Sequence, residues 1–104
     1  MMKVDISGYS LLGLGEEFTD YVKQRLDLSL SGQFINRSSV KVVIIKRNHL
    51  FNLAITLSEG LGKFFLQFRG DARALDAYHA FDLALNHLND QIAEYKIKEG
   101  LKKA

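Results

Sequence analysis

Residues 78–95 read YHAFDLALNHLNDQIAEY, and this stretch decides most of the fold. Apolar side chains recur in it every three or four positions, at Tyr78, Phe81, Leu85, Leu88, Ile92 and Tyr95. That spacing lines up one face of an α-helix, which has about 3.6 residues per turn. The sequence therefore predicts a long helix that is capped by Asp71 or Asp76, ends near Lys98 and buries one apolar stripe.

The first thirty residues predict a strand and a second helix. Val4 and Ile6 alternate with polar neighbours before Gly8, as in a strand with one buried face. Residues 12–30 carry apolar side chains at every fourth position, namely Leu14, Phe18, Val22 and Leu26. We therefore expect a strand followed by an amphipathic helix, with a loop after it.

Three more strands are predicted between the two helices, because β-branched residues and alternating polarity dominate residues 39–47, 51–58 and 64–69. Asn48-His49 supplies the first turn, residues 59–62 supply the second, and Gly70-Asp71 is expected to close the last strand. Strands that follow one another through tight turns must be antiparallel, whereas a helix between the first two strands makes them parallel.

The sequence thus predicts an α+β fold of order β-α-β-β-β-α, in which residues 1–104 form a single domain. It is a two-layer sandwich: a four-stranded mixed sheet carries both helices on one face, since each helix has one apolar stripe. The expected core consists of Val4, Ile6, Phe18, Val22, Leu26, Val42, Ile44, Leu53, Ile55, Phe64, Leu66, Phe81, Leu85, Leu88 and Ile92.

Composition narrows the possible chemistry. The chain has no cysteine, which excludes disulfides, thiolate metal sites and cysteine nucleophiles, and its start lacks the apolar core of a signal peptide. We expect a cytoplasmic protein with no membrane contact. The formal net charge is only +2, but the bases gather in separate clusters, which favours one charged face.

No motif indicates catalysis or a cofactor. Gly13-Leu14-Gly15 precedes a helix, but Phe18 replaces the third glycine of a dinucleotide fingerprint and acids follow. His49, His79 and His87 are too far apart in the predicted fold to form a metal site. We therefore expect neither an enzyme nor a bound metal or cofactor.

The long helix resembles the second helix of the ribosome hibernation-promoting factors, also called ribosome-associated inhibitors or sigma-factor modulation proteins, in its residues Asp76-Ala77-Tyr78-His79-Ala80-Phe81-Asp82. Four further family patterns occur in order on the expected elements, at Arg25-Leu26, Ile45-Lys46-Arg47, Gly60-Leu61 and Tyr95-Lys96. The likeness extends over nearly the whole chain and is to the short form, or to a lone N-terminal domain.

This resemblance implies a protein that binds the small ribosomal subunit in the channel for messenger and transfer RNA, and that blocks translation or protects idle ribosomes. It also implies the contacts: Arg25, Lys46 and Lys96 match basic positions of the family, and we expect them to meet ribosomal RNA phosphates. Lys23, Arg47 and Lys98 are expected to support them. Folded RNA is bound mainly through its shape and backbone, which suits cations on a rigid surface.

The sequence alone also permits a different class of function. If both helices cover one sheet face, then Val43, Ile45 and Phe65 lie on the opposite face without an evident cover. The chain could then be a protein-interaction module that forms a homodimer through this open face.

Overall fold

The computed structural model describes residues 3–30, 38–61 and 64–103, with side chains at 3–30, 39–58, 66–95 and 97. Its elements are β1 (Lys3–Ser7), a one-turn 3-10 helix η1 (Ser10–Leu12), α1 (Glu16–Leu30), β2 (Ser38–Arg47), β3 (Leu50–Leu61), β4 (Phe64–Ala74) and α2 (Ala77–Lys103). The predicted α+β order β-α-β-β-β-α is confirmed.

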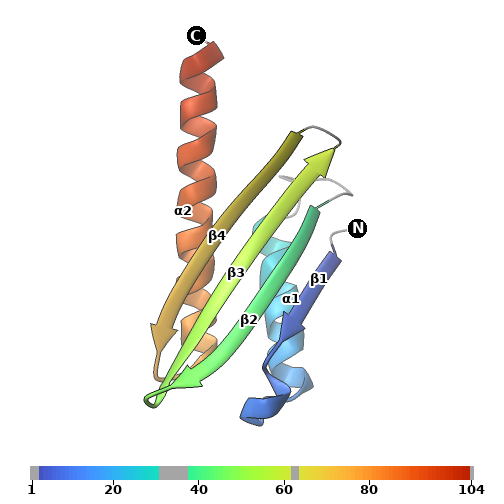
Figure 1. Cartoon of the computed structure of the whole chain (residues 1–104), viewed down its shortest axis with the longest axis vertical. Helices are drawn as coiled ribbons and strands as arrows, with labels where there is room; N and C mark the ends of the chain where they lie inside the picture. The colour runs from blue at the N-terminus through green and yellow to red at the C-terminus, as the bar shows by residue number, and fades with distance from the viewer. Residues whose placement is uncertain (1–2, 31–37, 62–63, 104) are drawn as a thin grey trace.

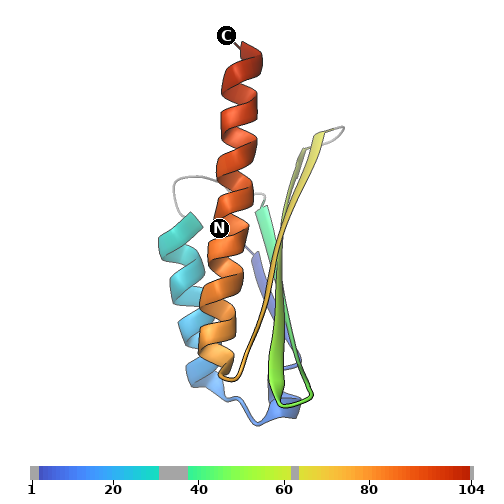
Figure 2. The same cartoon turned by 90° about the vertical axis from the view of Figure 1, so that its left-hand side faces the viewer.

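The four strands form one sheet in the order β1-β2-β3-β4 (Figure 1). β1 pairs with β2 in parallel, and β2 with β3 and β3 with β4 pair antiparallel, as the connections predict. Figure 2 shows α1 and α2 side by side on one face of the sheet, and none of the described elements covers the other face. We call this uncovered surface the open face.

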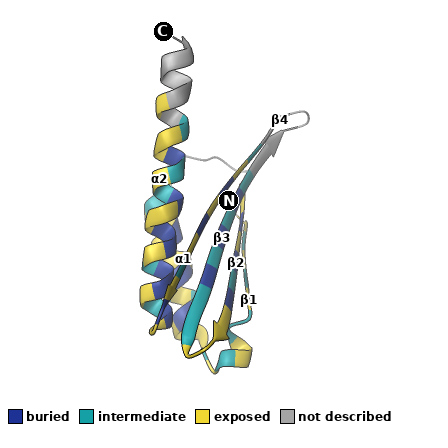
Figure 3. Ribbon diagram, turned by 60° about the vertical axis from the view of Figure 1, so that its left-hand side comes forward, coloured by how far each residue is buried: buried dark blue, intermediate teal, exposed yellow. Residues whose placement is uncertain are grey.

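The core lies between the sheet and the two helices (Figure 3). It contains Phe18, Val22 and Leu26 of α1, alternate residues of β2 and β3, and the predicted stripe of α2 except Tyr78 and Tyr95, which are partly buried against it. Val4, Ile6 and Leu66 are partly buried against it, while Leu30, Val40, Leu57 and Phe68 are core residues that the sequence reading missed. The predicted core side chain of Phe64 lies outside the described residues.

Two tyrosines of the α2 stripe pack as core aromatics. The ring of Tyr78 meets Phe18 edge-on at 5.4 Å, and the ring of Tyr95 meets Phe68 at 5.5 Å. Edge-to-face pairs of this kind add to the free energy of burial. The prediction that these tyrosines pack in the core is therefore confirmed.

Gly70 marks the place where α2 crosses β4 most closely. A Cβ atom added there would overlap the carbonyl oxygen of Ala84 and lie 2.5 Å from the backbone nitrogen of Leu88. Because Gly70 has no side chain, β4 continues beneath the helix to Ala74. The prediction that Gly70-Asp71 closes the strand is wrong: the glycine permits close helix packing instead of forming a turn.

The other element boundaries also differ from prediction at glycines and acids. Gly13 adopts a left-handed φ of 73° and ends η1, so α1 begins at Glu16 rather than at residue 12. Asp71 lies within β4 and cannot cap α2, which begins just after Asp76 and extends to Lys103. Residues 59–61 belong to the β3–β4 ladder, so the second turn is shorter than expected.

The turn between β2 and β3 is confirmed at Asn48-His49. Both residues have positive φ, 52° for Asn48 and 69° for His49. A two-residue hairpin turn with two positive φ angles matches the right-handed twist of the strands on either side. The turn fixes the register that pairs Arg47 with Leu50 and Lys46 with Phe51.

Candidate nucleic-acid interface

Lys46 and Arg47 lie at the hairpin end of β2, and they point to opposite faces of the sheet. The ammonium nitrogen of Lys46 lies 5.1 Å from the centroid of the Phe51 ring, on the face that carries the helices. Arg47 pairs with Leu50 on the open face. Both side chains are exposed, so this end of the molecule presents one cation on each side.

Arg25 takes part in a contact between the two helices. The hydroxyl of Tyr21 donates to both carboxylate oxygens of Asp82, at 2.7 and 2.9 Å, while the Arg25 guanidinium donates to the Tyr21 oxygen at 3.3 Å. A guanidinium nitrogen of Arg25 also lies 3.7 Å from Asp82. Burial, followed by the hydrogen bond to Asp82, raises the pKa of Tyr21. The positive charge of Arg25 is therefore already partly neutralised by Asp82.

Lys23 faces a different surface from Arg25, because residues two apart on a helix point to nearly opposite sides. It lines a small hollow with Asp5, Tyr9 and Thr19, beside β1 at the edge of the sheet. The two basic residues of α1 are therefore not neighbours in space.

Lys96 and Lys98 belong to the distal half of α2, and their side chains lie outside the described residues. The backbone still gives their distance from the hairpin end. Phe51, the partner of Lys46, pairs with Ala74 immediately before α2 begins at Ala77. At about 1.5 Å per residue, Lys96 lies roughly 28 Å farther along the helix. The six predicted contacts thus extend along the molecule and do not form one cluster.

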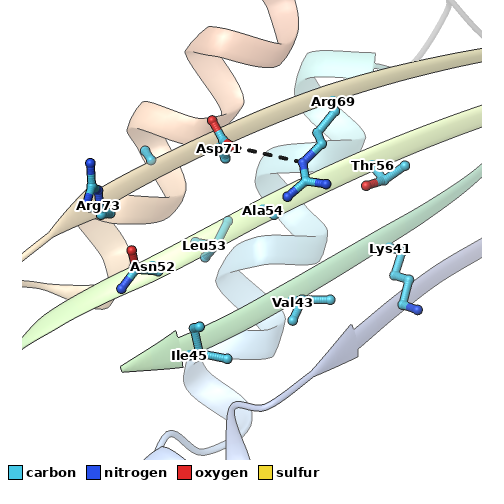
Figure 4. A pocket seen from close by; sticks show the side chains of 11 residues that line it. Lys41, Val43, Ile45, Asn52, Leu53, Ala54, Thr56, Arg69, Asp71 and Arg73 are labelled. Carbon is cyan, nitrogen blue, oxygen red and sulfur yellow. Dashed lines mark ion pairs between the residues drawn. The ribbon is translucent and has the colours of Figure 1, made fainter. Parts of the chain in front are cut away.

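The open face holds cations that the sequence reading did not select. Lys41 on β2, and Arg69 and Arg73 on β4, line a hollow of about 860 Å³ with Asn52 and Thr56 of β3 between them (Figure 4). Asp71 lies among them, with one carboxylate oxygen 4.0 Å from Arg69. The alternation of β4 would have placed Arg69 and Arg73 on one face, had the strand been continued past Gly70.

The apolar residues of the open face are few. Ile45 is 46% exposed and Val43 is half-buried, and both lie among the polar and charged residues that line the hollow. The side chain of Phe65 lies outside the described residues. The described part of the face is therefore a mixed surface, and a homodimer through Val43, Ile45 and Phe65 stays a prediction.

The histidines do not come together. His87 on α2 accepts the backbone N–H of Asp71 through its Nδ1 at 3.3 Å and so ties α2 to β4. Among the residues that the structure describes, no three histidine, cysteine or acidic side chains are grouped to hold a metal ion. No helix in the described part of the chain is long and apolar enough to cross a membrane.

The topology and the uncovered sheet face define a two-layer β-α-β-β-β-α domain. A family model described as "Sigma 54 modulation protein / S30EA ribosomal protein" matches residues 4–99, and the chain belongs to this family. The resemblance to the hibernation-promoting factor family is therefore confirmed. No curated protein matches the chain.

The fold is shared with solved structures. A ribosomal subunit interface protein from Coxiella burnetii matches with a TM-score of 0.62 at 14% identity, over 92% of this chain and 97% of that chain. The N-terminal domain of Protein Y from Thermus thermophilus matches with a TM-score of 0.60 at 20% identity, over 89% and 94%. At these identities the likeness shows the fold alone.

Proposed function

We propose that the protein binds the small ribosomal subunit in the channel for messenger and transfer RNA, and that it inhibits translation or protects idle ribosomes there. The observation that carries this proposal is the family match over residues 4–99. The names of the two structural neighbours, a ribosomal subunit interface protein and Protein Y, point the same way. The protein acts in the cytoplasm as a binding protein without catalysis.

The proposed contacts are spread along the molecule. Lys46 and Arg47 are available at the hairpin end, and Lys23 lies beside β1. Lys96 and Lys98 lie roughly 28 and 32 Å along α2 from its start near the hairpin. Separated cations suit an extended RNA surface, since each neutralised phosphate releases condensed counterions on its own. Because Arg25 is paired with Asp82, we expect it to contribute less than Lys46 or Lys96.

Co-sedimentation with purified small and large ribosomal subunits across a salt series tests the proposal. The wild-type protein should pellet with small subunits at low salt, and messenger RNA plus initiator transfer RNA should displace it. Replacing Arg25, Lys46 and Lys96 by alanine should weaken binding and flatten the salt dependence. A wild-type protein that fails to bind small subunits at low salt would show the proposal to be wrong.

A homodimer through the open face is the rival proposal, and the exposure of Ile45 favours it. Light scattering on the wild type and on Ile45→Lys separates the two. Replacing Ile45 by lysine should abolish a dimer through this face while leaving the melting temperature nearly unchanged, because an exposed residue contributes little to the core. A monomer that binds small subunits would exclude the rival.

A further inference from the structure

The described charges of the two helices are mostly acidic. In α1, and in α2 as far as Tyr95, acidic residues outnumber the two basic residues, Lys23 and Arg25. The acidic residues are Glu16, Glu17, Asp20, Asp27, Asp82, Asp90 and Glu94. All but Asp82, which is half-buried, are exposed. This part of the helical layer therefore repels a polyanion such as RNA.

The open face has the opposite balance. Its register brings together five bases and two acids within the described part of the sheet: Lys3, Lys41, Arg47, Arg69 and Arg73 against Asp5 and Asp71. Figure 4 shows Lys41, Arg69 and Arg73 on the near side of the sheet, with the helices behind it. The open face and the helices up to Tyr95 thus carry charge of opposite sign, whereas the sequence of α2 beyond Tyr95 is rich in lysine.

The strand pairing fixes the backbone separations of the basic residues that line the hollow. Lys41 pairs with Thr56, which pairs with Arg69, so these residues form one row across three strands. Two strand spacings separate Lys41 from Arg69 by about 10 Å, and four residues along β4 separate Arg69 from Arg73 by about 13 Å. These are backbone separations set by a paired sheet. Three cations so far apart suit a ligand that carries many anionic groups, because one small anion could not reach all of them.

Two of these cations, Lys41 and Arg73, make no ion pair among the described side chains, although Asp5 is the strand partner of Lys41 and Asp71 lies two residues from Arg73. Arg69 and Asp71 are joined at 4.0 Å with both side chains more than half exposed. An exposed pair of that length is weak. All three positive charges are therefore available to a ligand.

We propose that the open face is an RNA-binding surface, on which Lys41, Arg69 and Arg73 contact backbone phosphates of folded RNA. This inference deepens the proposed function and rests on it for the choice of RNA over another polyanion. Asn52 and Thr56 lie between the cations and offer hydrogen bonds to phosphate or 2′-hydroxyl groups. The described lining of the hollow holds no aromatic ring, so RNA in the hollow meets it through its backbone and not through stacked bases.

The test uses two probes, purified small ribosomal subunits and a labelled, protein-free RNA duplex, each titrated across a salt series. Each phosphate contact contributes about 0.7 to 0.9 to the slope of log affinity against log salt. The variant Lys41→Gln/Arg69→Gln/Arg73→Gln should therefore lose roughly 2 units of slope and about a hundredfold in affinity at 0.1 M salt.

Two further variants serve as controls. Lys41→Arg/Arg69→Lys/Arg73→Lys keeps each charge and should keep the slope. Asp71→Asn removes the acid beside Arg69 and should raise affinity for both probes. Thermal melting establishes that each variant is folded, and Asp71→Asn keeps the test decisive if the glutamine variant does not fold.

The outcomes separate this inference from the proposed function. If the wild type binds small subunits and the glutamine variant binds with unchanged affinity and slope, the inference is wrong and the function stands. If the wild type binds the RNA duplex through these residues but not the subunits, the proposed function fails and the surface stands. Tighter binding of polyglutamate than of RNA would assign the face to an acidic protein and overturn the proposal.

Discussion

Gly70 sets how closely α2 approaches the sheet. It lies on β4 directly beneath Ala84 and Leu88, where any Cβ atom would meet helix backbone instead of a movable side chain. Helix backbone cannot yield without shifting the whole apolar stripe that follows it. A residue with no side chain therefore controls the packing of the longest element.

We expect Gly70→Ala to lower the free energy of unfolding by about 1 to 3 kcal/mol, the usual cost of overpacking a core. Gly15→Ala is the matched control, because a Cβ atom added at Gly15 would meet nothing within 4 Å and the φ of Gly15 is not positive. It should change stability by less than about 1 kcal/mol. Urea denaturation of both variants measures the difference, and equal effects would contradict the proposed close contact.

A hydrogen bond from Tyr21 to Asp82, beside Arg25, joins α1 to α2, and its strength depends on pH. Burial and the hydrogen bond to Asp82 raise the pKa of Tyr21 above its ordinary value of 10.0, so the folded protein holds this proton more tightly than the unfolded chain does. The resulting stability is fully present below pH 10. It is lost as the pH rises through the folded-state pKa.

Tyr21→Phe should consequently be less stable than the wild type near pH 9, and the difference should shrink as the pH rises above 10. Denaturation of both proteins at several alkaline pH values tests this, because residues common to the two proteins titrate equally. A difference that stays constant or widens with pH would show that the Tyr21 hydroxyl is not held as described.

At the scale of elements, the sequence predicted types and topology better than boundaries. Alternation in β2 and β3 and the stripe of α2 are periodic signals, and they identified the sheet order and the buried faces correctly. Gly70 misled the reading because a glycine that permits helix packing looks the same as a glycine in a turn. Because the predicted fourth strand ended at Gly70-Asp71, Arg73 was not assigned to it. The basic residues of the open face were therefore not recognised from the sequence.

The site was less predictable from the sequence than the fold. Single residues such as Arg25 and Lys46 can be matched to a family pattern, but their partners depend on tertiary structure. Arg25 meets Asp82, which lies 57 positions later in the chain, and no local pattern reveals such a pair. The direction of Lys46 and Arg47 could be read from strand parity, whereas their distance from Lys96 required the length and direction of α2.

The β2–β3 hairpin offers a test at the scale of one element. His49 has a φ of 69°, a conformation that is costly for a residue with a Cβ atom and free for glycine. His49→Gly should raise the free energy of unfolding by roughly 0.5 to 1 kcal/mol. His79→Gly, the same change at an exposed position of α2, should lower it by about 0.5 kcal/mol. Thermal unfolding distinguishes the two signs, and destabilisation by His49→Gly would contradict the turn geometry.

At the scale of the whole molecule, the described charges divide between the two layers. Acids dominate the described helical surface, while bases dominate the open face and the hairpin end. A net charge of only +2 conceals this division, because charges of opposite sign on opposite faces cancel in the sum. We expect orientation on RNA to follow this asymmetry, with the open face, the hairpin end and the lysines at the end of α2 toward the phosphates and the acidic part of the helices away from them.

An electron cryomicroscopy map of the protein bound to the small ribosomal subunit is the most direct measurement of the central claim. We expect density for the β-α-β-β-β-α domain in the channel for messenger and transfer RNA, with Lys41, Arg69 and Arg73 against RNA phosphates. A domain bound outside that channel would contradict the proposed function. A domain within the channel whose open face points to solvent or to ribosomal protein would contradict the assigned surface.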